Sequence, residues 1–169
     1  MIKRVRSTKV GDIFCAVIDG QYKMYLQYIV SDITQLNSDV IRAFKKKYSL
    51  DDSPELAEIV KDEVAFYAHC CTRAGIKREY WEWVGNISDV GPIEPILFRS
   101  SEDEGHRKGE EPVKTSFKWW IWKVNEEHKY VGKLEGENRK AEIGGVFPPK
   151  YIVKRMQTGM YGGVYPSFE

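Results

Sequence analysis

His69, Cys70 and Cys71 form the one cluster in the sequence whose residue types could bind a metal ion or supply a nucleophile. Zinc sites use ligands that converge on one point, usually in pairs separated by about two to four residues. On a strand, neighbouring side chains point to opposite faces, so His69 and Cys70 could not bind the same ion there. We therefore expect a buried structural trio and no metal site.

A catalytic centre has no clear signature elsewhere in the sequence. A cysteine–histidine pair would need His106 or His128 close to a thiol, but the pattern places His106 in a loop and His128 at a turn. The glycines at 144 and 145 lack the Lys-Ser or Lys-Thr of a P-loop, and neither Gly-x-Ser-x-Gly nor His-Glu-x-x-His occurs. The sequence thus predicts no catalytic residues and no cofactor. An enzyme that uses His69 and a cysteine is the weakest of three hypotheses.

An acidic segment at about 100–113 is the first candidate for partner binding. It contains two glycines and almost no apolar residues, so it has little surface whose burial could offset the entropy of ordering it. We expect a flexible loop whose carboxylates meet a basic partner and raise the association rate. Solubility alone would explain the same composition. The candidate contact residues are Glu102, Asp103, Glu104, Glu110 and Glu111.

The tryptophans are candidates either for a core or for a binding surface. Trp81 and Trp83 are expected to share one face of a strand, as are Trp120 and Trp122, with Trp119 on the opposite face. Large aromatic side chains are enriched at interface hot spots and on base-stacking platforms. Core packing is the more common use, and we expect it for most of the five.

Basic residues beside these aromatics suggest an alternative function, a β-barrel-like protein that binds single-stranded nucleic acid. In that case the basic stretches should gather on one face beside exposed rings. The formal net charge of only +1 argues against it, so nucleic acid is not the expected partner. The basic stretches lie at Lys3–Lys9, Lys45–Lys47 and Lys150–Arg155.

The composition is typical of one compact domain in the cytoplasm. The chain has 169 residues, of which 42% are hydrophobic and 30% charged, and a single domain over 1–169 is expected. No apolar run approaches the roughly 18 residues of a membrane span, and no apolar segment of a secretion signal follows the basic start. Three cysteines, an odd number, fit a reducing compartment.

Periodicity predicts two hairpins and one helix with good local signals. Apolar runs at 12–18 and 22–30 flank Asp19-Gly20, a strong hairpin turn. A second hairpin is expected from 117–124 and 130–134. Between them, Ser38 precedes apolar residues at three- and four-residue spacing up to Tyr48, which predicts a helix.

Residues 61–72 have an ambiguous pattern. Ser53 and Pro54 are typical of a helix start, and we read a short helix at about 54–60 followed by a strand at about 63–72. One long helix to Gly75 is the alternative, and residues 151–156 fit a short helix or a strand. The predicted fold class is α+β, with a strongly bent, barrel-like antiparallel sheet and a few helices packed on one side.

Several short motifs resemble those of the type-26 immunity proteins of bacterial polymorphic toxin systems. The resemblance implies a small, cytosolic, β-rich and non-catalytic protein that binds a cognate toxin domain and blocks it. It implies no contact residues by position, and the acidic loop looks like a local elaboration of the family pattern. The motifs are Val10–Phe14, Asp19–Tyr22, Gly75–Lys77 with Trp81 and Gly85, Tyr130–Gly132, and Gly144–Val146.

Overall fold

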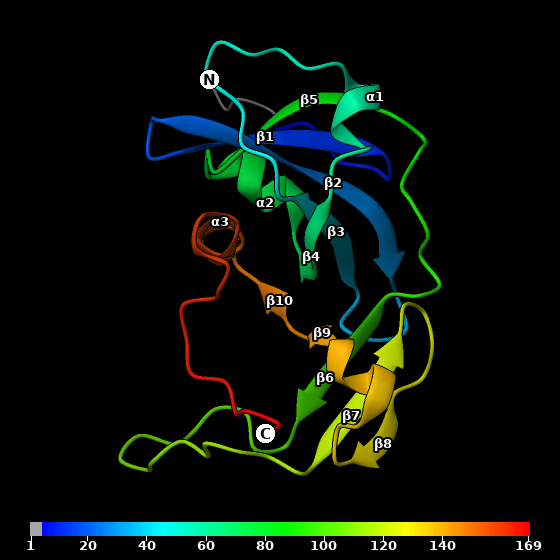
Figure 1. Cartoon of the computed structure of the whole chain (residues 1–169), viewed down its shortest axis with the longest axis vertical. Helices are drawn as coiled ribbons and strands as arrows, with labels where there is room; N and C mark the ends of the chain where they lie inside the picture. The colour runs from blue at the N-terminus through cyan, green and yellow to red at the C-terminus, as the bar shows by residue number, and fades with distance from the viewer. Residues whose placement is uncertain (1–4) are drawn as a thin grey trace.

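The computed structural model describes residues 5–169, which form ten strands in two sheets together with three α-helices (Figure 1). Lys3 and Arg4, which belong to the first basic stretch, lie outside the described residues. Over the described range, no helix has both the length and the apolar character needed to cross a membrane.

The larger sheet has six strands in the order β10-β4-β3-β2-β1-β5. Neighbouring strands are antiparallel except β10, which runs parallel to β4. The first predicted hairpin is confirmed, and Asp19 and Gly20 at its turn both have positive φ, 51° and 65°. The strands are β1 (Asp12–Ile18), β2 (Tyr22–Asp32), β3 (Ser38–Phe44), β4 (Val64–Cys70), β5 (Glu82–Asn86) and β10 (Val146–Phe147).

The helix predicted to follow Ser38 is wrong, because these residues form β3 in the middle of the sheet. Every residue from Val40 to Phe44 is buried, since helices or the second sheet cover both faces of β3. A strand buried on both faces loses the alternation of apolar and polar residues. Its apolar residues then match helical spacing by coincidence.

The ambiguous segment contains a short helix followed by a strand, which confirms the first reading and makes the single long helix wrong. The elements are α1 (Leu56–Ile59), β4 and then α2 (Thr72–Lys77). Ser53 does not cap α1, because the N-cap is Glu55 and no side chain bonds to the helix start. The segment with two readings near the end is a helix, α3 (Pro149–Thr158).

The smaller sheet has four strands in the order β8-β7-β6-β9. The second predicted hairpin is confirmed as β7 and β8. Only two glycines separate β9, an edge strand of the smaller sheet, from β10, an edge strand of the larger sheet. The short segment 142–147 therefore joins the two sheets. The elements are β6 (Leu97–Ser101), β7 (Trp119–Lys123), β8 (Lys129–Gly132), the 3-10 turn η1 (Gly136–Lys140) and β9 (Glu142–Ile143).

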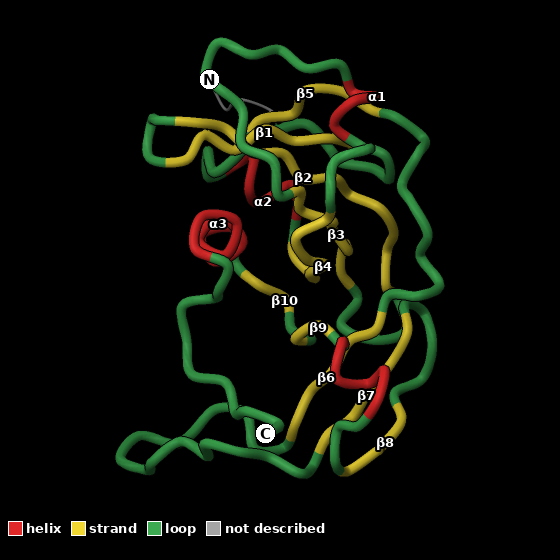
Figure 2. The backbone as a smooth tube through the Cα atoms, viewed as in Figure 1, coloured by secondary structure: helices red, strands yellow, loops and turns green. Residues whose placement is uncertain are grey.

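The α+β class is therefore confirmed, but the barrel-like shape is not. Both sheets are bent, and each has two free ends and does not close on itself (Figure 1). The connection from β6 to β7 is a long loop, drawn in green at the lower left of Figure 2.

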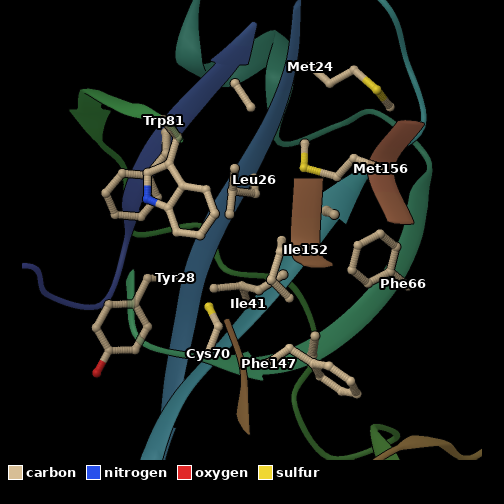
Figure 3. Close-up of a cluster of buried hydrophobic side chains, with 14 of the residues drawn as sticks. Met24, Leu26, Tyr28, Ile41, Phe66, Cys70, Trp81, Phe147, Ile152 and Met156 are labelled. Carbon is tan, nitrogen blue, oxygen red and sulfur yellow. The ribbon is translucent and has the colours of Figure 1, made fainter. Parts of the chain in front are cut away.

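The two faces of the larger sheet are covered by different elements. On one face α2 and α3 cover the core, where Ile152 and Met156 meet Leu26 and Ile41 (Figure 3). On the other face α1 covers one end, and the smaller sheet covers the other. Where the smaller sheet covers the larger one, buried side chains of both pack together, namely Ile29, Val40, Ile96, Phe98 and Trp122.

Candidate functional site

A groove of about 550 Å³ lies between the hairpin of β7 and β8 and the turn η1. Its volume falls in the range of about 300–1,000 Å³ that is usual for ligand sites. Leu97 and Ile121 give it an apolar centre, Trp122 borders it, and charged residues from the β7–β8 turn and from η1 complete its lining.

Strand pairing explains which side chains face the groove. Ile121 pairs with Lys129 across the hairpin, and Lys123 pairs with Leu97 on β6. Paired residues share a face of a sheet, so these four side chains lie on one side. A side chain at Gly144 would meet the Trp122 ring at 2.0 Å, so glycine lets the chain pass close beside that ring.

The charged residues of the groove divide into paired and unpaired groups. On η1, Lys140 Nζ donates to both carboxylate oxygens of Glu137, at 2.9 and 2.7 Å. Glu142 accepts from Arg155 at 2.8 Å. Among the described residues, the remaining charged side chains of the groove form no ion pair within 4.0 Å. The open part of the groove therefore carries unpaired positive and negative charges. These side chains are Lys123, Glu126, Glu127 and Lys129.

A fully buried polar cluster lies behind Trp122, on the side away from the groove. Trp122 Nε1 donates to Asp32 Oδ2 at 3.2 Å, and His69 Nε2 lies 2.9 Å from the same oxygen. The other oxygen accepts the backbone N–H groups of Gln35 and Asn125, at 3.3 and 3.1 Å. Asp32 from the larger sheet thus holds the β7–β8 hairpin in place.

His69 is a neutral part of this cluster. Burial lowers its pKa, although the nearby carboxylate of Asp32 acts in the opposite direction. The imidazole packs against Phe98 in a tilted arrangement, with ring centroids 4.2 Å apart. Cys70 is buried too, but Cys71 is exposed, so the expected buried trio is wrong for its third member because β4 ends at Cys70. Over residues 5–169, no three side chains of the kinds that bind metals come together.

The stability of the protein should decrease in acid because of His69. Its pKa in the folded state is below the ordinary 6.5, so the unfolded chain binds the proton more tightly. The free energy of unfolding should fall as pH drops below that value, by at most about 1.4 kcal/mol per pH unit for one proton. Urea unfolding between pH 7.5 and 5.5, within roughly one unit of a histidine's ordinary pKa, measures this slope.

Two variants isolate the contribution of His69. His69→Gln should show a shallower dependence on pH than the wild type, whereas His128→Gln, altered at an exposed histidine, should keep the wild-type slope. Equal slopes for the wild type and His69→Gln would contradict the assignment.

The structure does not bring the five predicted acidic residues into one patch. Glu102, Glu110 and Glu111 are exposed. Asp103 accepts from Ser116 Oγ at 2.7 Å and from Lys118 Nζ at 3.3 Å, and its pKa is lowered, mainly by the serine. The carboxyl of Glu104 turns inward, and burial raises its pKa to about 7. The loop that carries them joins β6 to β7, whereas the groove borders the turn between β7 and β8.

The tryptophans are mostly core residues, as expected. Trp81, Trp119 and Trp122 are buried. Trp81 lies just before β5 and packs in the core beside Phe14, so it does not share a strand face with Trp83, which is 37% exposed. The reason is that β5 begins at Glu82.

Trp120 is less buried than Trp122, although the two lie two residues apart on β7 and so share one face of the strand, as predicted. Its ring lies near those of His128 and Tyr130, at centroid distances of 4.6 and 5.1 Å, on the hairpin face opposite Ile121. Tyr130 is 51% exposed, so this face presents a small aromatic patch, defined here by Trp120, His128 and Tyr130.

Sequence reasoning did not identify the groove. Its residues come from β4, the start of β6, the β7–β8 hairpin, η1 and β9, which are far apart in the chain. The only local signal was the hairpin itself, since η1 carries no strong helical pattern. Comparisons with protein family models, curated proteins and solved structures found no match for this chain.

Proposed function

We propose that the chain is a non-catalytic protein-binding module of the immunity type, which binds a cognate toxin domain in the bacterial cytoplasm and blocks it. The groove is the observation that carries this proposal. Its apolar centre and its rim of unpaired charges of both signs match the usual anatomy of a protein interface. The motif resemblance points to the same class of function.

The hairpin of β7 and β8 offers two adjoining surfaces to such a partner. An apolar side chain of the toxin would fill the groove against Leu97 and Ile121, while its charged neighbours pair with Lys129 or Glu126. On the opposite face, the aromatic patch supplies Trp120 and Tyr130, residue types that are enriched among interface hot spots.

The acidic loop remains a proposed second contact. Glu102, Glu110 and Glu111 face solvent and could attract a basic toxin surface, which would raise the association rate more than the affinity. Asp103 and Glu104 contribute less to this proposal, since their carboxyl groups are engaged or turned inward.

Single-stranded nucleic acid is the less favoured partner. Lys45–Lys47 lie in the loop after β3 and Lys150–Arg155 lie on α3, and within them Lys45 pairs with Glu63 and Arg155 pairs with Glu142. Two features favour it, namely the aromatic patch and Arg6, whose guanidinium lies 3.9 Å from the ring centre of the partly exposed Trp83. Salt-dependent binding of a single-stranded oligonucleotide, lost on Trp120→Ala, would support this alternative over the toxin.

A substitution in the groove should separate the two proposed protein contacts. Ile121→Asp places a charge at the apolar centre and should weaken binding to the toxin domain encoded beside this gene by about 30-fold, or roughly 2 kcal/mol. Calorimetric titration of the purified pair measures the dissociation constant. Circular dichroism and the unfolding midpoint check that each variant is folded.

Matched variants complete this experiment. Val17→Asp introduces the same charge at an exposed apolar position on β1 and should leave the affinity unchanged. Glu110→Lys with Glu111→Lys should slow association and leave dissociation nearly unchanged. A neighbouring toxin that still kills cells expressing the wild-type protein would refute the proposed function, and full affinity of Ile121→Asp would refute the groove.

A further inference from the structure

A second cluster of charged side chains lies where α3, the C-terminal segment and the edge of the smaller sheet meet. Arg155 from α3 donates to Glu142 of β9 at 2.8 Å, and its guanidinium lies 4.7 Å from the ring centre of Tyr161. Arg99 from β6 donates to the backbone oxygen of Ala141. Figure 1 shows α3 and the C-terminal segment on one side of this region, and β6, β9 and β10 on the other.

The two arginines are close enough to affect each other. Burial lowers the pKa of Arg99, and the positive charge of Arg155 acts in the same direction. The carboxylate of Glu142 favours the charged form of both guanidinium groups. Glu142 contacts Arg155 directly, and its charge also acts on Arg99 without a hydrogen bond between them.

Unsatisfied hydrogen-bond donors concentrate in this cluster. Four buried side-chain polar atoms in residues 5–169 lack a partner within 3.5 Å, and three of them are Arg99 Nε, Arg155 Nη1 and the Tyr161 hydroxyl. The side chains of Arg155 and Tyr161 lie close enough to each other for a long hydrogen bond between them. All three can donate, and the Tyr161 side chain is only 8% exposed. Buried donors without an acceptor are costly, so such a concentration calls for an acceptor.

The neighbouring carboxyl of Glu104 does not supply this acceptor fully. It lies near Arg99, but burial raises its pKa to about 7, so at neutral pH it is partly protonated. No hydrogen bond joins it to either arginine among the described residues. The cluster thus has an excess of positive charge and of donors.

We propose that Arg99, Arg155 and Tyr161 form a binding site for one small oxyanion, such as sulfate, phosphate or a carboxylate. The planar guanidinium group presents its donors in a fork that matches such oxygens. The Arg155 and Glu142 side chains keep 16% and 19% of their surface exposed, so the cluster borders solvent although its three donor atoms are buried. A bound anion would join α3 and the C-terminal segment to β6. This inference is independent of the toxin.

Sulfate is the first probe, because its charge is constant near neutral pH. Calorimetry in sodium chloride of matched ionic strength should show saturable binding with one sulfate per chain. Tyr161→Phe removes only the hydroxyl, whereas Arg99→Lys keeps the positive charge but loses the Nε donor. Each of these two variants should bind sulfate at least tenfold more weakly than the wild type. Lys154→Gln, at an exposed cation of the same helix, should bind as the wild type does. Phosphate and acetate in parallel show whether a tetrahedral or a planar oxyanion is preferred.

Two results would overturn the site. Equal sulfate binding by all four proteins would mean an adventitious ion only, and no saturable binding to the wild type would mean that water alone satisfies these donors. If Arg99→Lys does not fold, Tyr161→Phe still tests the site, since it leaves the packing of the ring in place.

The pH dependence of the affinity tests whether Glu104 borders the anion. The ionisable groups near the Glu104 carboxyl are Arg99 and the neutral phenol of Tyr165. When Glu104 ionises above pH 7, its negative charge would compete with the bound anion for Arg99. Wild-type sulfate affinity should therefore fall from pH 6 to pH 8, while Glu104→Gln stays constant. Wild-type affinity that is the same at both values would place the anion elsewhere and overturn the site.

Discussion

Replacing Asp32 by asparagine should lower the free energy of unfolding by about 3–5 kcal/mol, because two buried donors lose a charged acceptor and each such hydrogen bond contributes about 1.5–3 kcal/mol. The carboxylate accepts the side-chain donors of His69 and Trp122 and the backbone N–H groups of Gln35 and Asn125. An amide of the same shape offers one oxygen and would turn its NH2 group toward two of these donors. Urea unfolding followed by tryptophan fluorescence measures the change.

Asp51→Asn is the matched control for this prediction. Asp51 is exposed, so the same chemical change should alter the free energy of unfolding by less than about 0.5 kcal/mol. A loss below about 1 kcal/mol for Asp32→Asn would contradict the view that this carboxylate holds the two sheets together, since one ordinary hydrogen bond contributes that much.

Trp122→Ala should cost about 3–5 kcal/mol, as is usual when a large buried aromatic side chain is removed. Its ring packs on Phe98 with centroids 5.9 Å apart, and its Nε1 donates to Asp32. The ring also stands between the groove and the buried His69. Its loss should leave a cavity, remove a donor from the Asp32 carboxylate and admit water to this buried group.

Trp120→Ala is the control, because it removes the same side chain two residues away on the same strand. Trp120 is half-buried beside His128 and Tyr130, and its loss should cost about 1 kcal/mol. Equal losses for the two variants would contradict the different burial of the two rings. Urea unfolding measures both, with fluorescence of the remaining tryptophans as the signal.

Elements with strong local signals could be predicted. The first hairpin depends on a turn where Asp19 and Gly20 both take positive φ, a property of the residues themselves. The short helix and strand in 54–72 are only one of two readings, because helical spacing and strand alternation overlap there and the sequence alone does not decide between them. β3 could not be predicted in this way, because a strand covered on both faces has no alternation, and its neighbours β2 and β4 are set by pairing across the chain.

The candidate sites also combine features that the local sequence predicts with features that only the fold decides. Geometry along one strand argued correctly that His69 and Cys70 face opposite sides. That His69 would meet Asp32 depends on a contact between residues 37 positions apart. The acidic residues formed one group in the sequence, but the fold engages Asp103 with Ser116 and turns Glu104 inward, which no composition predicts.

From the amino-acid order one can derive the α+β class, the two hairpins and a core rich in tryptophan, because turn preference and side-chain alternation act over a few residues. The groove, the buried Asp32–His69–Trp122 contact and the Arg99–Arg155 cluster arise only when β6, β7, η1, β9 and α3 are packed together. Each depends on burial and on charges brought together across the chain. Burial and the distances between side chains are set by the packing of the whole chain, so patterns within a few residues of sequence cannot predict them.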